Sequence, residues 1–211
     1  MIKAVIFDFG RVISAQKPPS LFHTYERDLG LAPDTINTIM FESEAWEEAL
    51  LGKKTVEEFW QAIGPELGLK AVAEVEAFHH RYHADEAVNE GVVRLILRLH
   101  GRYKLAVLSN SPPGLICWLD SWKILDLFHV IFCSGDEGIV KPDPRAFART
   151  LERLRVKPEE ALFIDDTPEH VDAARALGLR GILFTPAARL EEDLTELLAE
   201  DHHSDFSRSS R

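Results

Sequence analysis

Cysteine is scarce in this sequence. Among the 211 residues there are two cysteines, Cys117 and Cys133. They are too few and too far apart for a disulfide framework or a zinc cluster. Both lie among apolar residues, so we expect two buried free thiols in a reducing compartment.

Long hydrophobic runs are also missing. The N-terminal apolar stretch is interrupted at Asp8, too early for a signal peptide, and no other stretch reaches the length of a membrane span. We therefore expect a cytoplasmic protein that has no membrane partner.

Positive charge is in short supply. The chain carries 24 Lys and Arg against 35 Asp and Glu, a net charge of −11, and no run of basic residues forms a patch. Such a surface repels the phosphates of nucleic acids and the headgroups of anionic lipids. We therefore expect no nucleic-acid partner, and nothing in the sequence indicates an oligomeric state.

Short apolar runs rich in β-branched and aromatic residues recur along the chain, with helical patterns between them. Such runs predict buried parallel strands joined by crossover helices, here for example over 143–154 and 168–178. The fold class is therefore α/β, a doubly wound Rossmann-like parallel sheet. The predicted strands are 4–9, 105–110, 130–135, 161–166 and 181–185.

The gap between the first two strands is far longer than a simple crossover. It contains amphipathic segments near 19–30, 34–51, 55–63 and 71–83. These segments predict an inserted α-helical cap over residues 15–86, with an α/β core formed by 1–14 and 87–199. A helix near 87–100 returns the chain to the sheet. The polar, aperiodic tail 200–211 is typical of disorder.

Three of the predicted strands end in reactive polar groups. These are Asp8, then Ser109 and Asn110, then Asp165 and Asp166. One such residue alone is an ordinary turn or helix-cap residue. However, the carboxyl ends of strands in an open α/β sheet border the ligand crevice, so these groups should converge there.

The adjacent carboxylates of Asp165 and Asp166 repel each other unless a cation or a lysine shares the site. Lys141 follows the third strand in the segment GIVKPDP, whose prolines stiffen the loop. A lone lysine would be expected in solvent, but beside the carboxylates of Asp165 and Asp166 Lys141 is a candidate counter-charge.

Four segments resemble, in order and spacing, the motifs of the haloacid dehalogenase superfamily. They are VIFDFGRV, VLSNS, GIVKPDP and LFIDDTPEHVDAARALG. The resemblance implies Asp8 as the nucleophile, with Ser109 and Asn110 in contact with the transferred phosphate. It also implies Lys141 as the cation that steadies nucleophile and phosphate, and the position of the helical insertion matches that superfamily's cap.

The resemblance further implies a Mg²⁺ ion held by Asp8, the backbone carbonyl of Gly10 and Asp166, with Asp165 in a supporting contact. The residue types agree with this chemistry, because hard oxygen ligands suit Mg²⁺. A cation and a lysine relieve the repulsion between an attacking carboxylate and a phosphoryl group. We therefore expect a Mg²⁺-dependent phosphatase that acts on a small phosphorylated metabolite through an aspartyl-phosphate.

Two positions depart from the family pattern. The second aspartate of the first motif, which protonates the leaving oxygen, is replaced by Gly10, which has no acid. His170 stands where the fourth motif often has an aspartate or asparagine. It is either a surface residue of a helix or a partner of the metal cluster.

Two other functions fit parts of the pattern. A metal-independent 2-haloacid dehalogenase would use Asp8 on a carbon centre, but such enzymes typically carry tyrosine at position 10 and lack the paired acids. A catalytically weak binding or regulatory protein would use the cap as its interaction surface. The joint presence of Asp8, Lys141 and Asp166 weighs against this second alternative.

The cap is expected to select the substrate by closing over the crevice. Glu44 and Trp46 are candidate substrate-binding residues, although a helix that buries Phe41, Ala45 and Trp46 explains the same segment. Arg11, just after the first motif, is a third candidate.

Overall fold

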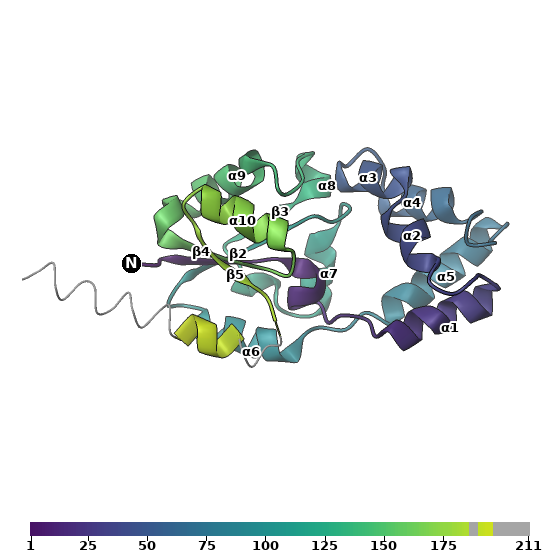
Figure 1. The fold of residues 1–211 in the computed structure, drawn as a ribbon, viewed down its shortest axis with the longest axis horizontal. Helices are drawn as coiled ribbons and strands as arrows, with labels where there is room; N and C mark the ends of the chain where they lie inside the picture. Colours follow the sequence, from purple (N-terminus) through teal and green to yellow (C-terminus); the bar gives the residue numbers. More distant parts are fainter. Residues whose placement is uncertain (186–189, 196–211) are drawn as a thin grey trace, which may run out of the picture.

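The sheet at the centre of the molecule has the predicted architecture (Figure 1). The computed structural model describes residues 1–185 and 190–195. Its five strands are all parallel and lie in the order β3-β2-β1-β4-β5. The α/β, doubly wound fold class is thus confirmed. The strands are β1 (Ala4–Phe7), β2 (Lys104–Ser109), β3 (Val130–Cys133), β4 (Ala161–Asp165) and β5 (Arg180–Leu183).

Helices cover both faces of the sheet. On one face, α6 (Glu90–Leu99), α7 (Leu115–Ser121) and the helical residues 190–195 pack against alternate strand residues such as Val5 and Phe7. On the other face, α9 (Pro144–Leu154) and α10 (Pro168–Ala176) pack against Ala4 and Ile6. Because both faces are covered, the central strands are continuous apolar runs.

Shorter elements complete the core and connect its strands. They are η1 (Phe9–Ile13), η2 (Leu125–Leu127), α8 (Ser134–Glu137) and η3 (Pro158–Glu160).

A helical unit lies between β1 and β2 in the sequence and beyond the carboxyl end of the sheet in space (Figure 1). It has an aromatic core of its own, which includes Tyr25, Phe59, Trp60 and Phe78. Its helices occur where the cap is predicted, and the exact limits of 15 and 86 stay a prediction. They are α1 (Pro19–Leu29), α2 (Ile36–Phe41), α3 (Glu44–Leu50), α4 (Val56–Ile63) and α5 (Val72–Ala84).

The two connections between the sheet and the helical unit run side by side. The N–H of Ala15 donates to the carbonyl of Ala87 at 2.7 Å. The ammonium of Lys17, whose side chain is 6% exposed, lies 2.8 Å from a carboxylate oxygen of Glu86. An ion pair between a buried lysine and a partly exposed glutamate therefore ties the incoming connection to the outgoing one.

The single amphipathic segment predicted over 34–51 is two helices in the structure. Ser43 has an extended backbone between them, and its hydroxyl accepts a hydrogen bond from the N–H of Trp46 at 3.2 Å. A serine that caps a helix in this way starts a new helix. The periodicity of the segment did not reveal this break.

The prediction of two buried thiols is wrong for one of them. Cys133 is buried at the end of β3, but Cys117 is exposed. Leu115 and Leu119 take the face of α7 that packs on the sheet, and this leaves Cys117 on the outer face.

Within residues 1–185 and 190–195, no helix is both long and apolar enough to cross a membrane. The predicted disordered tail, 200–211, lies outside the described residues, as do 186–189 and 196–199 of the predicted core.

Candidate active site

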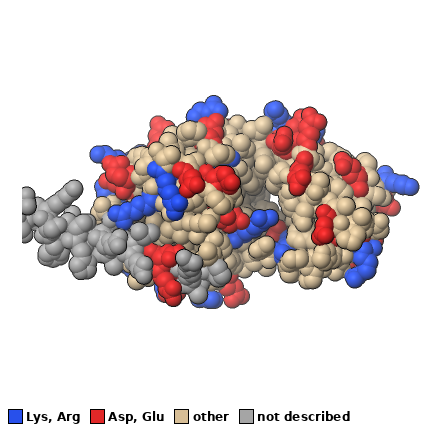
Figure 2. Space-filling model, viewed as in Figure 1, with Lys and Arg blue, Asp and Glu red and all other residues tan. Residues whose placement is uncertain are grey.

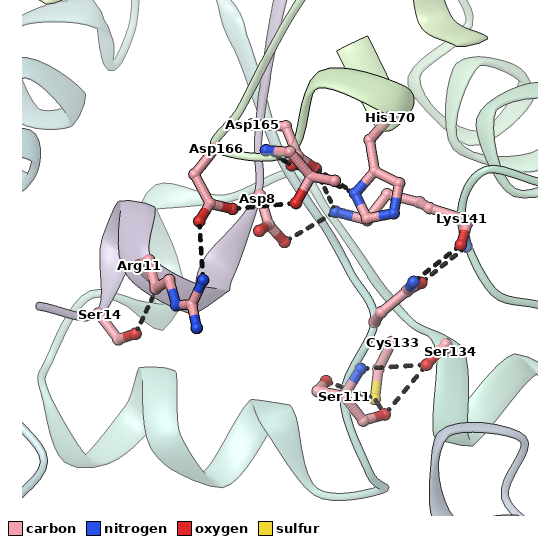
Figure 3. A network of polar contacts seen from close by, with 12 residues as sticks. Asp8, Arg11, Ser14, Ser111, Cys133, Ser134, Lys141, Asp165, Asp166 and His170 are labelled. Carbon is pink, nitrogen blue, oxygen red and sulfur yellow. Dashed lines mark hydrogen bonds and ion pairs between the residues drawn. The ribbon is translucent and has the colours of Figure 1, made fainter. Parts of the chain in front are cut away.

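Asp8 and Asp165 lie side by side at the carboxyl edge of the sheet (Figure 3). Their positions follow from the register of two neighbouring strands, in which Phe7 of β1 pairs with Ile164 of β4. The N–H of Asp8 continues this pairing and donates to the carbonyl of Ile164 at 2.8 Å. The predicted convergence of these two strand ends is therefore present.

Lys141 lies between the two carboxylates. Its ammonium donates to Asp8 Oδ1 at 2.8 Å and to Asp165 Oδ2 at 2.5 Å, and its side chain is 1% exposed. Of the two interpretations of this lysine, the geometry supports the counter-charge and not the solvated side chain.

The loop that carries Lys141 is held by Asn110. The side-chain amide of Asn110 donates to the carbonyl of Lys141 at 2.9 Å, and its oxygen accepts from the N–H of Lys141 at 2.7 Å. Asn110 thus positions the lysine, a task that the sequence did not reveal. Ser109 is buried at the end of β2. Contact of either residue with a phosphate stays a prediction.

Asp165 has further partners at the start of α10. Its Oδ1 accepts from the N–H of Thr167 at 2.8 Å, and the Nδ1 of His170 lies 3.2 Å from each carboxylate oxygen. The side chain of His170 is 17% exposed. Of the two interpretations of His170, this contact supports the partner of the acidic cluster.

Asp166 is more open than Asp165. Its side chain is 22% exposed, with one oxygen 3.6 Å from the guanidinium of Arg11. The backbone of Arg11 has φ of 58°, a left-handed conformation that costs free energy in a residue other than glycine. The sharp turn η1 thereby brings Arg11 to the rim of the site (Figure 3).

The pKa values of Asp8 and Asp165 are shifted in opposite directions. Burial raises the pKa of Asp8 to about 6, against the opposing charge of Lys141. Burial alone would also raise the pKa of Asp165, but the His170 hydrogen bond and the charge of Lys141 lower it to about 2. Asp165 is therefore the firmly ionised partner of the lysine.

The carboxylates form a set that can hold a metal ion. Oxygens of Asp8, Asp165 and Asp166 all lie within 4.8 Å of one another. Lys141 is bound to two of these groups and offsets one negative charge. The remaining negative charge and the hard oxygen donors fit a small divalent cation such as Mg²⁺.

The three predicted substrate-binding residues occupy different places. Arg11 is at the rim, Glu44 is exposed at the start of α3, and Trp46 packs against Phe41 and Phe59 within the helical unit. The packing of Trp46 is what the amphipathic-helix alternative predicts. Substrate contacts of all three stay predictions.

Sequence reasoning missed the network behind Asn110. The N–H of Ser111 donates to the hydroxyl of Ser134 at 3.0 Å, and the thiol of Cys133 lies 3.3 Å from the Ser111 hydroxyl. These residues join the loops after β2 and β3 (Figure 3). The signal was available, because Ser111 directly follows the predicted strand 105–110, and Cys133 and Ser134 lie near the end of the predicted strand 130–135.

Known proteins resemble this chain. A family model described as haloacid dehalogenase-like hydrolase matches residues 2–178. Sesquiterpene phosphatase astK from Aspergillus oryzae is 27% identical over 93% of this chain and 96% of its own length. D-ribitol-5-phosphate phosphatase from Bacteroides thetaiotaomicron is 27% identical over 94% of this chain and 99% of its own length. Drimenol cyclase drtB from Aspergillus calidoustus is 28% identical over 93% of this chain, which spans 37% of that protein.

A solved structure shares the fold. It is the crystal structure of a HAD family enzyme from Bacteroides thetaiotaomicron in complex with magnesium and inorganic phosphate. The TM-score is 0.72, with 88% of this chain and 95% of that chain covered at 20% identity. The likeness confirms the Rossmann-like arrangement of the sheet and its helices.

The pKa of Asp8 offers a test of the buried lysine. In metal-free protein, Lys141→Met should raise the Asp8 pKa above about 6, because the charge that lowers it is gone while burial remains. Carbon-13 NMR of labelled aspartate carboxyls measures this titration. Lys3→Met is the control, since Lys3 pairs with Glu160 at the surface. An unchanged or lowered Asp8 pKa in Lys141→Met would contradict the arrangement.

The raised pKa of Asp8 also makes the free energy of unfolding depend on pH. A carboxyl with a raised pKa binds a proton more readily in the folded than in the unfolded chain. The contribution of Asp8 to the free energy of unfolding should therefore fall as the pH rises from 3.8, the ordinary pKa of an aspartate, to about 6, the pKa of Asp8 in the folded chain. In metal-free protein, Asp8→Asn should remove this part of the pH dependence, measured by urea unfolding at several pH values.

Proposed function

Because this chain belongs to the haloacid dehalogenase-like hydrolase family, we propose that it is a phosphatase of a small phosphorylated metabolite, with Asp8 as its nucleophile. The observation that carries the proposal is the buried ammonium of Lys141 between Asp8 and Asp165. A lysine there holds the nucleophile in place and leaves a positive charge beside the position where a phosphoryl group would react.

The proposal includes Mg²⁺ as the cofactor. Asp8, Asp166 and the backbone carbonyl of Gly10 would hold the ion, with Asp165 supporting the cluster through Lys141 and His170. Asp166 is the better direct ligand of the two adjacent acids, because Asp165 is already occupied by three partners. When bound, Mg²⁺ would neutralise charge on the phosphate.

The residues of the chain would divide the reaction into two steps. A carboxylate oxygen of Asp8 attacks phosphorus, and the bond from phosphorus to the alcohol oxygen breaks. Water then attacks the phosphorus of the aspartyl-phosphate, which releases inorganic phosphate and restores Asp8. Lys141 would keep Asp8 oriented through both steps, and Asn110 would keep Lys141 in place.

The first step lacks a side-chain acid at position 10. A positioned acid or base is worth about a hundred- to ten-thousand-fold in rate. Without one, the alcohol must leave as an alkoxide or take its proton from water, so the rate should depend steeply on the pKa of the leaving alcohol. Good leaving groups would hide this defect.

The rival functions differ in what they require. A 2-haloacid dehalogenase needs no metal ion and so has no use for a cluster of three carboxylates, and the relatives named phosphatases span nearly the whole chain. Those two relatives are named for a sesquiterpene and for D-ribitol 5-phosphate, which differ greatly in polarity. The family thus supports phosphate ester hydrolysis but leaves the alcohol open.

A substrate panel tests this function. Phosphate release from phosphorylated metabolites is expected with Mg²⁺ and not with a chelator, and Asp8→Asn should reduce turnover to background because an amide is a poor nucleophile. Asp172→Asn is the control, since this carboxylate lies on the surface of α10 with Arg175. Chloride release from 2-chloropropionate that persists with chelator would instead support the dehalogenase. Full activity of a folded Asp8→Asn variant would remove Asp8 from the nucleophile role.

Gly10→Asp tests the missing acid. Gly10 has φ of −62° and ψ of 127°, and a Cβ at this position would meet no atom within 4 Å, so an aspartate fits. The variant should raise kcat/KM for alkyl phosphates relative to aryl phosphates, by up to about a hundredfold. The ratio cancels general damage to the site. Equal effects on both classes in a folded, Mg²⁺-binding variant would mean that another group already supplies the proton.

A further inference from the structure

A column of aromatic rings crosses from the sheet to the helical unit. Phe9 stacks on Trp122 with 5.4 Å between ring centroids, and Trp122 lies 5.6 Å from Trp118. Trp118 stacks on His83 of α5 at 4.7 Å, with 15° between the ring planes. The column thus joins η1 and α7 of the core to the last turn of α5.

One end of the column is next to Asp8 in the sequence. Phe9 directly follows Asp8, and α7 lies at the end of the sheet that faces the helical unit (Figure 1). The molecular surface is hollowed between the two units (Figure 2). Phe9, Trp118, Trp122 and His83 are all only partly buried, so each of the four residues retains some accessible surface.

The charges of His83 and Lys17, which lie at the column, are removed or compensated. Burial, followed by the charges of His79 and Lys17, lowers the pKa of His83 to about 4, so His83 is neutral at pH 7. Lys17 lies 2.8 Å from Glu86, which compensates its charge. The four rings of the column are therefore uncharged at pH 7, and their surface is mainly aromatic.

We propose that Phe9, Trp122, Trp118 and His83 form the leaving-group subsite, and that the substrate is a phosphate monoester of an alcohol that bears an aromatic ring. This inference rests on the proposed phosphatase function. A flat ring would gain dispersion and apolar burial against these side chains while its phosphate reaches Asp8. A carbohydrate phosphate would gain much less on this side.

Gly10 supports the same class independently. Because position 10 provides no acid to the leaving oxygen, alcohols of low pKa depart most easily, and phenols have lower pKa values than aliphatic alcohols. Stacking selects the ring through binding, whereas the absence of the acid selects it through chemistry.

The test separates these two effects. The substrates are 2-(1-naphthyl)ethyl phosphate and ethyl phosphate, whose alcohols have similar pKa values, so their difference reports contacts and not reactivity. The wild-type enzyme should prefer the naphthyl ester in kcat/KM. Trp118→Ala should reduce this preference by about tenfold, the size expected from one lost stacking partner, and Trp118→Phe should retain most of it.

Phe22→Ala is the matched control, because Phe22 packs edge-on against Tyr25 inside the helical unit, away from the column. It should leave the preference unchanged. An equal loss for both esters in Trp118→Ala would mean that the column only joins the two units, and would overturn the subsite.

Binding without turnover keeps the two proposals distinguishable. Calorimetric titration with 2-(1-naphthyl)ethylphosphonate and ethylphosphonate, which have no ester bond to cleave, should give tighter binding of the naphthyl compound in wild type and a smaller difference in Trp118→Ala. Equal affinities would overturn the subsite, whether or not the protein hydrolyses phosphate esters. Tighter naphthyl binding without hydrolysis of any ester would instead contradict the proposed function and leave the ring-binding subsite standing.

Discussion

The burial of the Lys141 ammonium between two carboxylates is the constraint on which the site depends. Removing one partner of a buried ion pair costs about 3–5 kcal/mol, because a charge is then left without compensation. The charge of Lys141 is compensated only if the fold brings Asp8, Asp165 and the loop that carries Lys141 to the same place. The parallel register of β1 and β4 brings the two carboxylates side by side, and Asn110 holds the loop.

The same arrangement gives the three aspartates of the site different roles. Asp165 is bound by Lys141, His170 and the N–H of Thr167, so it acts as a support. Asp166 stays more open at the rim, and Asp8 has a pKa raised by burial, which a nearby cation would lower. Charge compensation is therefore incomplete within the protein, which agrees with a divalent ion as part of the proposed site.

Much of this could be predicted from the sequence, because it depends on local patterns. Apolar runs revealed the strands, and the rule that ligands lie at strand ends brought Asp8 and Asp165 together. The repulsion between the adjacent carboxylates of Asp165 and Asp166 then indicated Lys141 as the counter-charge. The missed features depend on contacts between distant residues. The stack of Trp118 on His83 and the outward position of Cys117 follow from how α5 and α7 pack, which residue periodicity alone does not encode.

In the proposed reaction, the phosphoryl group passes through the side chain of Asp8. Borohydride reduces an acyl-phosphate to an alcohol, so enzyme quenched with borohydride during turnover should carry homoserine at position 8. Mass spectrometry of the peptide that contains Asp8 detects this change, and enzyme treated without substrate serves as the reference. We expect homoserine at position 8 only when substrate is present. An unmodified Asp8 under full turnover, with phosphate on another residue such as His170, would contradict it.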